Sequence, residues 1–577
     1  MTSSSTGAVP PLFAARDAGR RVLGPHPGGE GPCCWRPAAG TAGRRSERPG
    51  DYVGAVDQGT GSYDVVVVGG GHNALVSAAY LARAGLSVVV LERLGHIGGA
   101  AVSVEPFAGH PARLSRYSYL VSLMPQQLMA DLDLDVRLAS RTTASYTPWT
   151  RAGRDGGLLV ERPEGEATRA SFRELTGGDD EYAAWQAFYD EVGRLAGVVA
   201  PTLMQPLPLE RELRDRVDER TWADVVEEPL GRAITRRFAD DTVRGVVATD
   251  ALIGTFASMD DPSLVQNRCF LYHLIGNGTG EWRVPIGGMG AVTDALARAA
   301  VEAGAEIVTG AGVSSITPGA DGAEVTWHDG EREHAVTGRR VLSGVAPWVL
   351  RILLGEGEDA ETKPSGSQLK INVLLDRLPA LRSGVDPAVA FAGTLHLAED
   401  YSLLEQGYAA AAGGSVPDPL PGEVYCHSLT DPSILGDRAG SAHTLTYFGL
   451  HTPDGLFDAD PGARDVAVQR ALASIDAVLA EPLADCIATD ADGRPCVEAK
   501  VPQDVEQDLA MPGGHIFHGD LEWPWAPNRS RLDTPARQWG VQTEHDTVLL
   551  CGSGARRGGA VSGLGGHNAA QAVLAEV

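Results

Sequence analysis

Residues 63–99 read YDVVVVGGGHNALVSAAYLARAGLSVVVLERLGHIGG and join an apolar run, a glycine turn and a helix-like segment without a gap. The valines at 65–68 are typical of a strand buried in a parallel sheet. Gly69, Gly71 and Ala74 then match the G-x-G-x-x-G/A spacing, in which the glycines form a tight turn and let the backbone approach a pyrophosphate. A helix over 73–84 would direct its first N–H groups at the phosphates. The stretch predicts a dinucleotide-binding βαβ unit.

An acidic residue follows at the position that the βαβ unit requires. Residues 87–91 are predicted as the second strand, and Glu92 ends it about 20 residues after the glycine turn. A carboxylate there accepts hydrogen bonds from ribose hydroxyls and disfavours a 2′-phosphate. Gly98, Gly99 and Ala100 form a further turn of small residues, which indicates that something large lies close to the backbone.

Composition excludes several classes of partner. The chain has 577 residues and a formal net charge of −27, which argues against binding nucleic acid or an anionic membrane by charge. No uncharged apolar run reaches about 18 residues, so we expect no transmembrane segment, although peripheral membrane contact stays open. The sequence says nothing about the oligomeric state.

The seven cysteines have no repeating spacing and form no C-x-x-C pair. The chain therefore lacks the paired thiols of a flavin disulfide reductase and the spacing of a zinc site, and we expect no metal. Isolated buried thiols are expected at Cys269, Cys426, Cys486, Cys496 and Cys551.

Three further segments leave alternatives open. Residues 113–125 either flank the cofactor or begin a helix capped by Ser115 or Ser118. The strand predicted at 547–551, with its glycine-rich turn and final helix, either brings a second helix dipole to the cofactor or packs on the sheet. Several large side chains in the helical region 172–264 either line an apolar pocket or belong to the core: Trp185, Tyr189, Met204, Phe238 and Phe256.

Several motifs together resemble the phytoene desaturase-like family of flavin-dependent oxidoreductases. They are GGGHNALVSAAYLARAG at 69–85, LERLGHIGGAA at 91–101, GEWRVPIGGMGAVTDALA at 280–297, LKINVLLDRLP at 369–379, PGGHIFHG at 512–519 and the C-terminal LLCGSG and GGHNAA. The resemblance is strongest to the subgroup that contains pyridine nucleotide-disulphide oxidoreductase domain-containing protein 2 and the flavin-type carotenoid ketolases.

The resemblance implies one bound FAD. On the ADP half it implies contacts from Gly69, Gly71, Ala74, Glu92, Arg93, Gly98 and Gly99, with Val313 near the adenine. His72, Asn73 and Ala100 are further candidate cofactor contacts. Near the flavin or its ribityl chain it implies Gly552, Gly554, Gly563 and Asn568. The family's His-Pro-Gly-Gly-Gly run is replaced here by Arg556, Arg557, Gly558, Gly559 and Ala560, which puts the electrostatics beside the flavin, and the acceptor, in doubt.

The expected fold is α/β: a Rossmann-like FAD-binding domain of the glutathione reductase or amine oxidase-like type with a discontinuous α+β substrate domain. Residues 61–150, 281–360 and 541–577 would form the FAD-binding domain. The substrate domain would combine mostly helical residues 151–280 with sheet-rich residues 361–540. Residues 1–60 are expected to be a disordered extension, with a transit peptide as the alternative, so we expect a cytoplasmic protein or, if eukaryotic, a mitochondrial matrix protein.

The predicted function is FAD-dependent dehydrogenation or desaturation of a largely apolar, polyene or lipid-like small molecule, with a quinone or oxygen as acceptor. A flavin ketolase or isomerase and a non-enzymatic scaffold of the same fold are the alternatives. The candidate catalytic side chains are His72, Lys370 and His518; His515 and Arg556 are weaker. Each also has a structural role open to it, as a hydrogen-bonding loop residue or a solvated charge.

Overall fold

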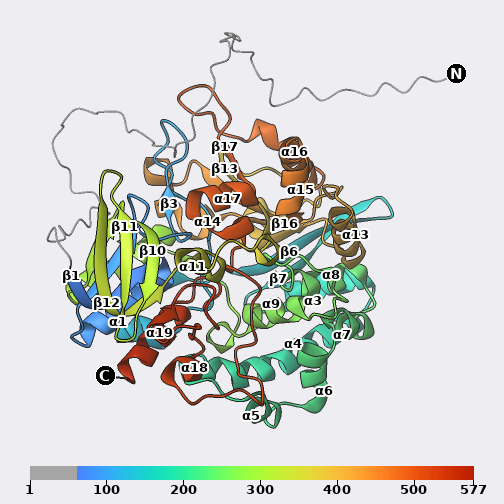
Figure 1. Ribbon diagram of the computed structural model, residues 1–577. Helices are drawn as coiled ribbons and strands as arrows, with labels where there is room; N and C mark the ends of the chain where they lie inside the picture. Colours follow the sequence, from blue (N-terminus) through green and yellow to red (C-terminus); the bar gives the residue numbers. More distant parts are fainter. Residues whose placement is uncertain (1–60, 577) are drawn as a thin grey trace. The chain divides into compact units, whose positions relative to one another are not determined.

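The structure is a computed structural model and describes residues 61–576 (Figure 1). The predictions for the N-terminal extension, and the residues Cys33 and Cys34, lie outside the described residues. No helix between residues 61 and 576 is both long enough and apolar enough to cross a membrane.

A first sheet carries the glycine turn. Its order is β10–β11–β12–β1–β2–β9, and β18 pairs with β12. The central pairs β12–β1, β1–β2 and β2–β9 are parallel. The buried valines of β1 explain its central place, because both faces of a parallel sheet are covered. The strands are β1 (Gly61–Val68), β2 (Val88–Glu92), β9 (Glu306–Thr309), β10 (Gly312–Pro318), β11 (Ala323–His328), β12 (Glu333–Ser343) and β18 (Val548–Leu550).

A second sheet has the order β17–β13–β16–β15–β14–β6–β7 and is mostly antiparallel. The β6–β7 hairpin, which the sequence analysis divided between two segments, joins this sheet through β14. Every residue of β13 is buried. The strands are β6 (Thr143–Arg151), β7 (Arg154–Glu161), β13 (Ser367–Leu375), β14 (Thr394–Leu397), β15 (Gly422–Tyr425), β16 (His443–Pro453) and β17 (Val497–Lys500).

Helices cover both sheets, and those between β7 and β8 (Val284–Pro285) form one block in Figure 1. Trp185, Phe188, Val192 and Leu195 of α4 are buried, which confirms the apolar spacing predicted for this helix. The helices are α1 (His72–Arg83), α2 (Gln126–Asp131), α3 (Glu166–Thr176), α4 (Asp180–Val199), α5 (Glu210–Arg214), α6 (Glu219–Trp222), α7 (Leu230–Arg237), α8 (Asp241–Thr249), α9 (Val265–Leu274), α10 (Met289–Glu302), α11 (Pro347–Leu353), α12 (Pro387–Ala390), α13 (Tyr401–Ala412), α14 (His427–Thr430), α15 (Asp454–Ala459), α16 (Ala463–Asp476), α17 (Pro502–Leu509), α18 (Pro535–Trp539) and α19 (Leu564–Leu574).

The structure decides one local prediction that the sequence left open. Strand β15 ends at Tyr425, where its pairing with β16 stops, and residues 427–430 form α14. The helix alternative for 113–125 is wrong: β4 (Leu114–Ser115) pairs with β3 (Ser103–Val104), and α2 begins only after Pro125. A residue before proline is disfavoured in helical backbone, so the proline delays the helix.

The five cysteines within the described part of the chain are free and buried, as predicted: Cys269, Cys426, Cys486, Cys496 and Cys551. Burial raises the pKa of the Cys551 and Cys269 thiols to about 12, so both stay protonated at neutral pH. They are packing residues of the core.

The two ends of the described chain meet where α1 packs against α19. A Cβ built on Gly566 of α19 would lie 1.8 Å from the carbonyl oxygen of Asn73 in α1. No side chain fits in this helix crossing, so the two helices reach their observed separation only with glycine there.

Replacing Gly566 with alanine should therefore lower the free energy of unfolding by about 3 kcal/mol, because the helices must separate. Thermal unfolding of the purified protein measures this. The matched control is Gly197→Ala in α4, where a Cβ meets nothing within 4 Å. It should be neutral or stabilise by up to about 1 kcal/mol. Equal melting temperatures for the two variants would contradict the contact.

A buried histidine makes stability depend on pH. His451 is 1% exposed, and its ring packs edge-on against both Phe256 and Tyr408, with centroids 6.0 and 5.9 Å away. Burial lowers its pKa from 6.5 to about 3. Between these values the unfolded chain binds more protons than the folded chain, so this contribution to stability is complete above pH 6.5 and is lost as the pH falls toward 3.

His451→Phe should therefore reduce the slope of unfolding free energy against pH by about 1 kcal/mol per pH unit between pH 6 and 4.5. Denaturant unfolding at a series of pH values measures the slope. Between pH 7 and 8 the variant and the parent protein should run parallel, whatever the difference in their absolute stability. Identical slopes below pH 6 would show that this imidazole is not held neutral.

Candidate active site

A cavity of about 620 Å³ lies where the glycine turn, the C-terminal loop 552–561 and the second sheet meet. One part of its wall consists of backbone and small residues that follow β1 and β2. Another part consists of aromatic and ionisable side chains from α4, β14 and β15, together with smaller side chains from α8 and β6. The cavity thus joins two chemically different chambers, which we call the glycine cradle (residues 69–74, 92–93, 99–100 and 552–553) and the substrate chamber (the remaining wall).

The glycine cradle presents bare backbone. Gly69 has φ 91°, a conformation that favours glycine, and forms the turn. Gly71 has φ −70° and ψ 167°, which any residue adopts, and a Cβ there would meet nothing within 4 Å. It precedes α1 as an N-cap without a side-chain hydrogen bond. The fold itself does not require glycine at position 71, so the empty space and the open helix end indicate a bound anion.

Glu92 is buried at the end of β2 and holds this turn. One carboxylate oxygen accepts a hydrogen bond from Gly70 N–H at 2.6 Å, and the other accepts one from Leu94 N–H at 2.7 Å. The carboxylate also lines the cavity, where its remaining lone pairs face the space available to a ribose.

His72 and Asn73 bind the cradle to the C-terminal loop. His72 Nε2–H donates to the carbonyl of Ala560 at 3.1 Å, and Asn73 Nδ2 donates to the carbonyl of Gly558 at 3.0 Å. Burial lowers the pKa of His72 to about 4, so its imidazole is neutral. The buried Asn73 Oδ1 has no partner among the described residues. It is an acceptor left for a ligand.

Eleven of the residues expected at the cofactor line the cavity: Gly69, Gly71, His72, Asn73, Ala74, Glu92, Arg93, Gly99, Ala100, Val313 and Gly552. The other four expected residues do not line the cavity. Gly98 N–H donates to the carbonyl of Gly70, and Gly554 lies in a separate pocket beside Pro347.

The remaining two, Gly563 and Asn568, belong to α19 and its N-cap. Gly563 caps this helix with φ 74° and faces Leu128 and Val76, and Asn568 is fully buried beside His567. Sequence reasoning missed the loop residues that line the cavity in their place: Ser553, Gly559, Ala560 and Val561. These residues are small and lie among glycines, and this pattern in the sequence could have identified them as a segment that a ligand approaches closely.

The two arginines of the C-terminal loop do not line the cavity. Arg557 is 1% exposed and donates to the carbonyls of Pro524, Leu203 and Gln205 at 2.7–3.2 Å. Arg556 bonds to the carbonyl of Trp525 and to Glu522. Both therefore fasten the segment 522–525 to the loop, and Arg556 is neither a group beside the cofactor nor a solvated surface charge.

Of the candidate catalytic side chains, His72, Lys370 and His518 line the cavity and His515 does not. Lys370 is buried, so a solvated role is wrong. Its Nζ donates to the carbonyls of Ser115 and Tyr117 at 2.7 and 2.6 Å and lies 4.7 Å from the Tyr119 ring centre. Burial lowers the pKa of this amine well below its usual value and the pKa of His518 to about 3. The His518 imidazole is therefore neutral at pH 7, and the Lys370 Nζ is held by two backbone carbonyls.

The segment 113–125 flanks the cavity through Tyr117, Tyr119 and Leu123, in agreement with the first of its two alternatives. Among the large side chains of the helical region, Trp185 and Tyr189 line the substrate chamber. Trp282, Phe448 and Phe517 complete an aromatic wall. Met204, Phe238 and Phe256 pack elsewhere.

A second group of lining residues is polar and contrasts with this aromatic wall. We call it the polar end, and it consists of Arg141, Asp250, His396, Glu423 and Tyr425. Burial raises the pKa of Asp250 and, to about 7, that of Glu423. Tyr425 O–H donates to Glu423, and Thr249 donates to it at 3.3 Å. The sequence analysis missed this group.

Comparisons with known proteins agree with this geometry. Residues 75–370 match the family described as flavin containing amine oxidoreductase. An uncharacterised protein of Mycobacterium tuberculosis is 53% identical over 525 residues, which cover 89% of this chain and 97% of that protein. Pyridine nucleotide-disulfide oxidoreductase domain-containing protein 2 of mouse is 31% identical over 89% of this chain and 94% of its own length.

Solved structures share the fold at lower identity. A putrescine oxidase has a TM-score of 0.53 at 17% identity and covers 90% of this chain and 100% of its own. Cyclohexylamine oxidase from Brevibacterium oxydans has a TM-score of 0.50 at 16% identity, over 89% and 98% of the two chains. The expected α/β fold with an FAD-binding domain and a substrate domain is thereby confirmed. Because the family is one of redox enzymes, the non-enzymatic scaffold alternative is wrong. From its sequence and its fold, this chain belongs to the flavin-containing amine oxidoreductase family and is an FAD-dependent oxidoreductase.

Proposed function

We propose that this enzyme oxidises a small molecule with an apolar body and one polar end, and passes the electrons to oxygen or a quinone. The observation that supports this best is the contrast within the substrate chamber, where an aromatic wall meets a buried group of ionisable side chains. The aromatic wall offers an apolar substrate a dry surface, and the polar end offers hydrogen bonds that fix its orientation.

The proposed FAD contacts follow from the cradle. Gly71 and the uncapped first turn of α1 would hold the pyrophosphate, Glu92 the ribose of the adenosine, and Val313 the adenine. Gly552 and loop residues 559–561 would lie against the flavin half. When bound, FAD supplies the acceptor for two electrons from the substrate. We propose in addition that segments 61–150, 281–360 and 541–577, without the β6–β7 hairpin, act as the FAD-binding domain.

The polar end argues against a pure hydrocarbon substrate. A polyene without polar groups would cover Arg141, Asp250 and Glu423 without pairing them, and each buried unpaired polar group costs about 1–3 kcal/mol. The phytoene desaturase-like assignment therefore extends to this chain only in its FAD chemistry. The ketolase and isomerase alternatives gain no support from any group in the chamber.

The first test is spectroscopic. Purified protein should carry about one FAD per chain, with flavin absorbance that bleaches on anaerobic photoreduction. Mixing the reduced protein with air-saturated buffer, and separately with a soluble quinone, should restore the absorbance with one acceptor at least about tenfold faster than with the other. A protein without flavin absorbance that takes up no added FAD would contradict the assignment.

The second test concerns the cradle. Gly71→Val should weaken FAD binding by at least about 100-fold, because the new side chain occupies the space proposed for the pyrophosphate. Unfolding of the apoprotein should change little, since no protein atom lies within 4 Å of a Cβ there. Fluorescence titration of apoprotein with FAD measures the affinity, and Gly178→Val, also in open space, is the control. Unchanged FAD affinity in Gly71→Val would refute the placement.

A further inference from the structure

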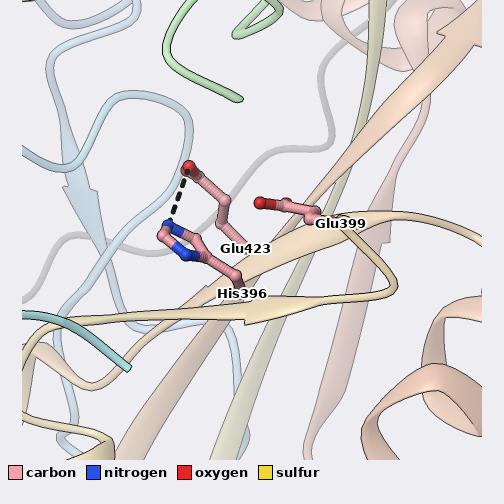
Figure 2. A group of neighbouring side chains, drawn as sticks. All are labelled: His396, Glu399 and Glu423. Carbon is pink, nitrogen blue, oxygen red and sulfur yellow. Dashed lines mark ion pairs between the residues drawn. The ribbon is translucent and has the colours of Figure 1, made fainter. Parts of the chain in front are cut away.

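Three side chains from β14, β15 and the turn after β14 converge in the core beside the cavity: His396, Glu399 and Glu423 (Figure 2). His396 and Glu423 are cross-strand partners in the antiparallel β14–β15 ladder, which places both side chains on one face of the sheet. Glu399 follows β14 after Ala398, whose φ is 53°. The three residues are 4%, 2% and 2% exposed, respectively.

The separations between these groups are those of ligands around one ion. Each residue offers one atom that lies within 4.8 Å of the other two, and His396 Nε2 is 3.9 Å from Glu423 Oε1. Ligand atoms about 2.1 Å from a shared ion are at most about 4.2 Å apart. The distance between His396 Nε2 and Glu423 Oε1 is therefore already short enough for both atoms to bind one ion. A ligand pair at the 4.8 Å limit would have to approach by a few tenths of an ångström.

Glu399 points into this group without any partner. Both of its carboxylate oxygens are buried and accept no hydrogen bond from the described residues, and Figure 2 shows them directed toward the other two side chains. The pair Glu399 and Glu423 does not share a hydrogen bond either. Two buried carboxyl groups that shared a proton would be joined by a short hydrogen bond, so these two do not share one, and the space between them is open to a cation.

Charge around the group is unbalanced. Glu399 and Glu423 are buried and Asp250 beside them is half-buried, and within residues 61–576 no Arg or Lys lies within ion-pair distance of any of the three. Arg141 donates to Thr394 instead, at 3.3 Å. Uncompensated buried carboxylates are strongly unfavourable, and a divalent cation would remove most of the imbalance.

We propose that His396, Glu399 and Glu423 bind a divalent cation that accepts imidazole and carboxylate ligands together, such as Zn²⁺ or Mn²⁺. The second shell is present: Thr147 Oγ1 lies 2.8 Å from His396 Nδ1 and fixes the ring so that Nε2 faces the group. Tyr425 and Thr249 hydrogen-bond to Glu423 in the same way.

Because His396 and Glu423 line the cavity, the open positions of the ion face the substrate chamber. There the ion would bind an oxygen of the substrate, a carboxylate, carbonyl or alkoxide. Substrate binding by the ion rests on the proposed function, whereas binding of the cation itself does not.

The test is metal binding by the FAD-loaded protein. Elemental analysis after purification without chelator should find about one divalent transition metal per chain, and the protein stripped with a chelator should bind ZnCl₂ or MnCl₂ with submicromolar affinity in competition with a chromogenic chelator. Glu399→Gln should weaken this binding by about 100-fold. The control His427→Gln replaces a buried histidine on α14 outside the ligand set and should stay within about threefold of the parent protein.

A parent protein that contains no metal, and binds Zn²⁺ and Mn²⁺ no better than Glu399→Gln does, would overturn the proposal. A rise in melting temperature for Glu399→Gln would then identify a protonated carboxyl pair in place of an ion. Flavin content and photoreduction, measured on the same samples, separate failure of the metal site from failure of the proposed function, because neither requires the cation.

Discussion

The approach of α19 to α1 is the contact on which the site depends. Both helices begin beside the cavity, and glycine at position 566 lets the backbone of one helix reach the carbonyl of Asn73 in the other. The same closeness lets His72 and Asn73 bond to carbonyls of the C-terminal loop. Residues almost 500 positions apart in the chain thus form one wall, and a shift of either helix would open the cradle.

The part of this site that lies within one continuous segment is predictable from the sequence. Gly69, Gly71, Ala74 and Glu92 belong to a single βαβ unit, whose spacing fixes the turn, the helix end and the carboxylate together. The parallel pairing of β1 with β2 follows from the same unit. Their positions can be predicted from this local segment and its strand pairing alone.

The C-terminal residues were harder because their positions depend on packing between distant segments. The resemblance implies that Gly563 and Asn568 lie near the flavin, but Gly563 faces Val76 of α1 and Leu128 of α2, while the small residues 559–561 line the cavity. Arg557 is an example of a position that local sequence does not predict. Its hydrogen bonds reach residues 203–205 and 524, and no local pattern predicts which carbonyls a buried guanidinium will meet.

The polar end depends on register. His396 faces Glu423 only because β14 pairs with β15 in one alignment, and a slip of one residue between the strands would place the two side chains on opposite faces of the sheet. Such a group is costly to bury, and the fold retains it beside an aromatic wall that could have been continued with apolar residues. A substrate with unlike ends has one favourable orientation in this chamber, whereas a uniform hydrocarbon could slide along it. Fixing one carbon of the substrate against the flavin requires such an asymmetry, and the register of two strands supplies it.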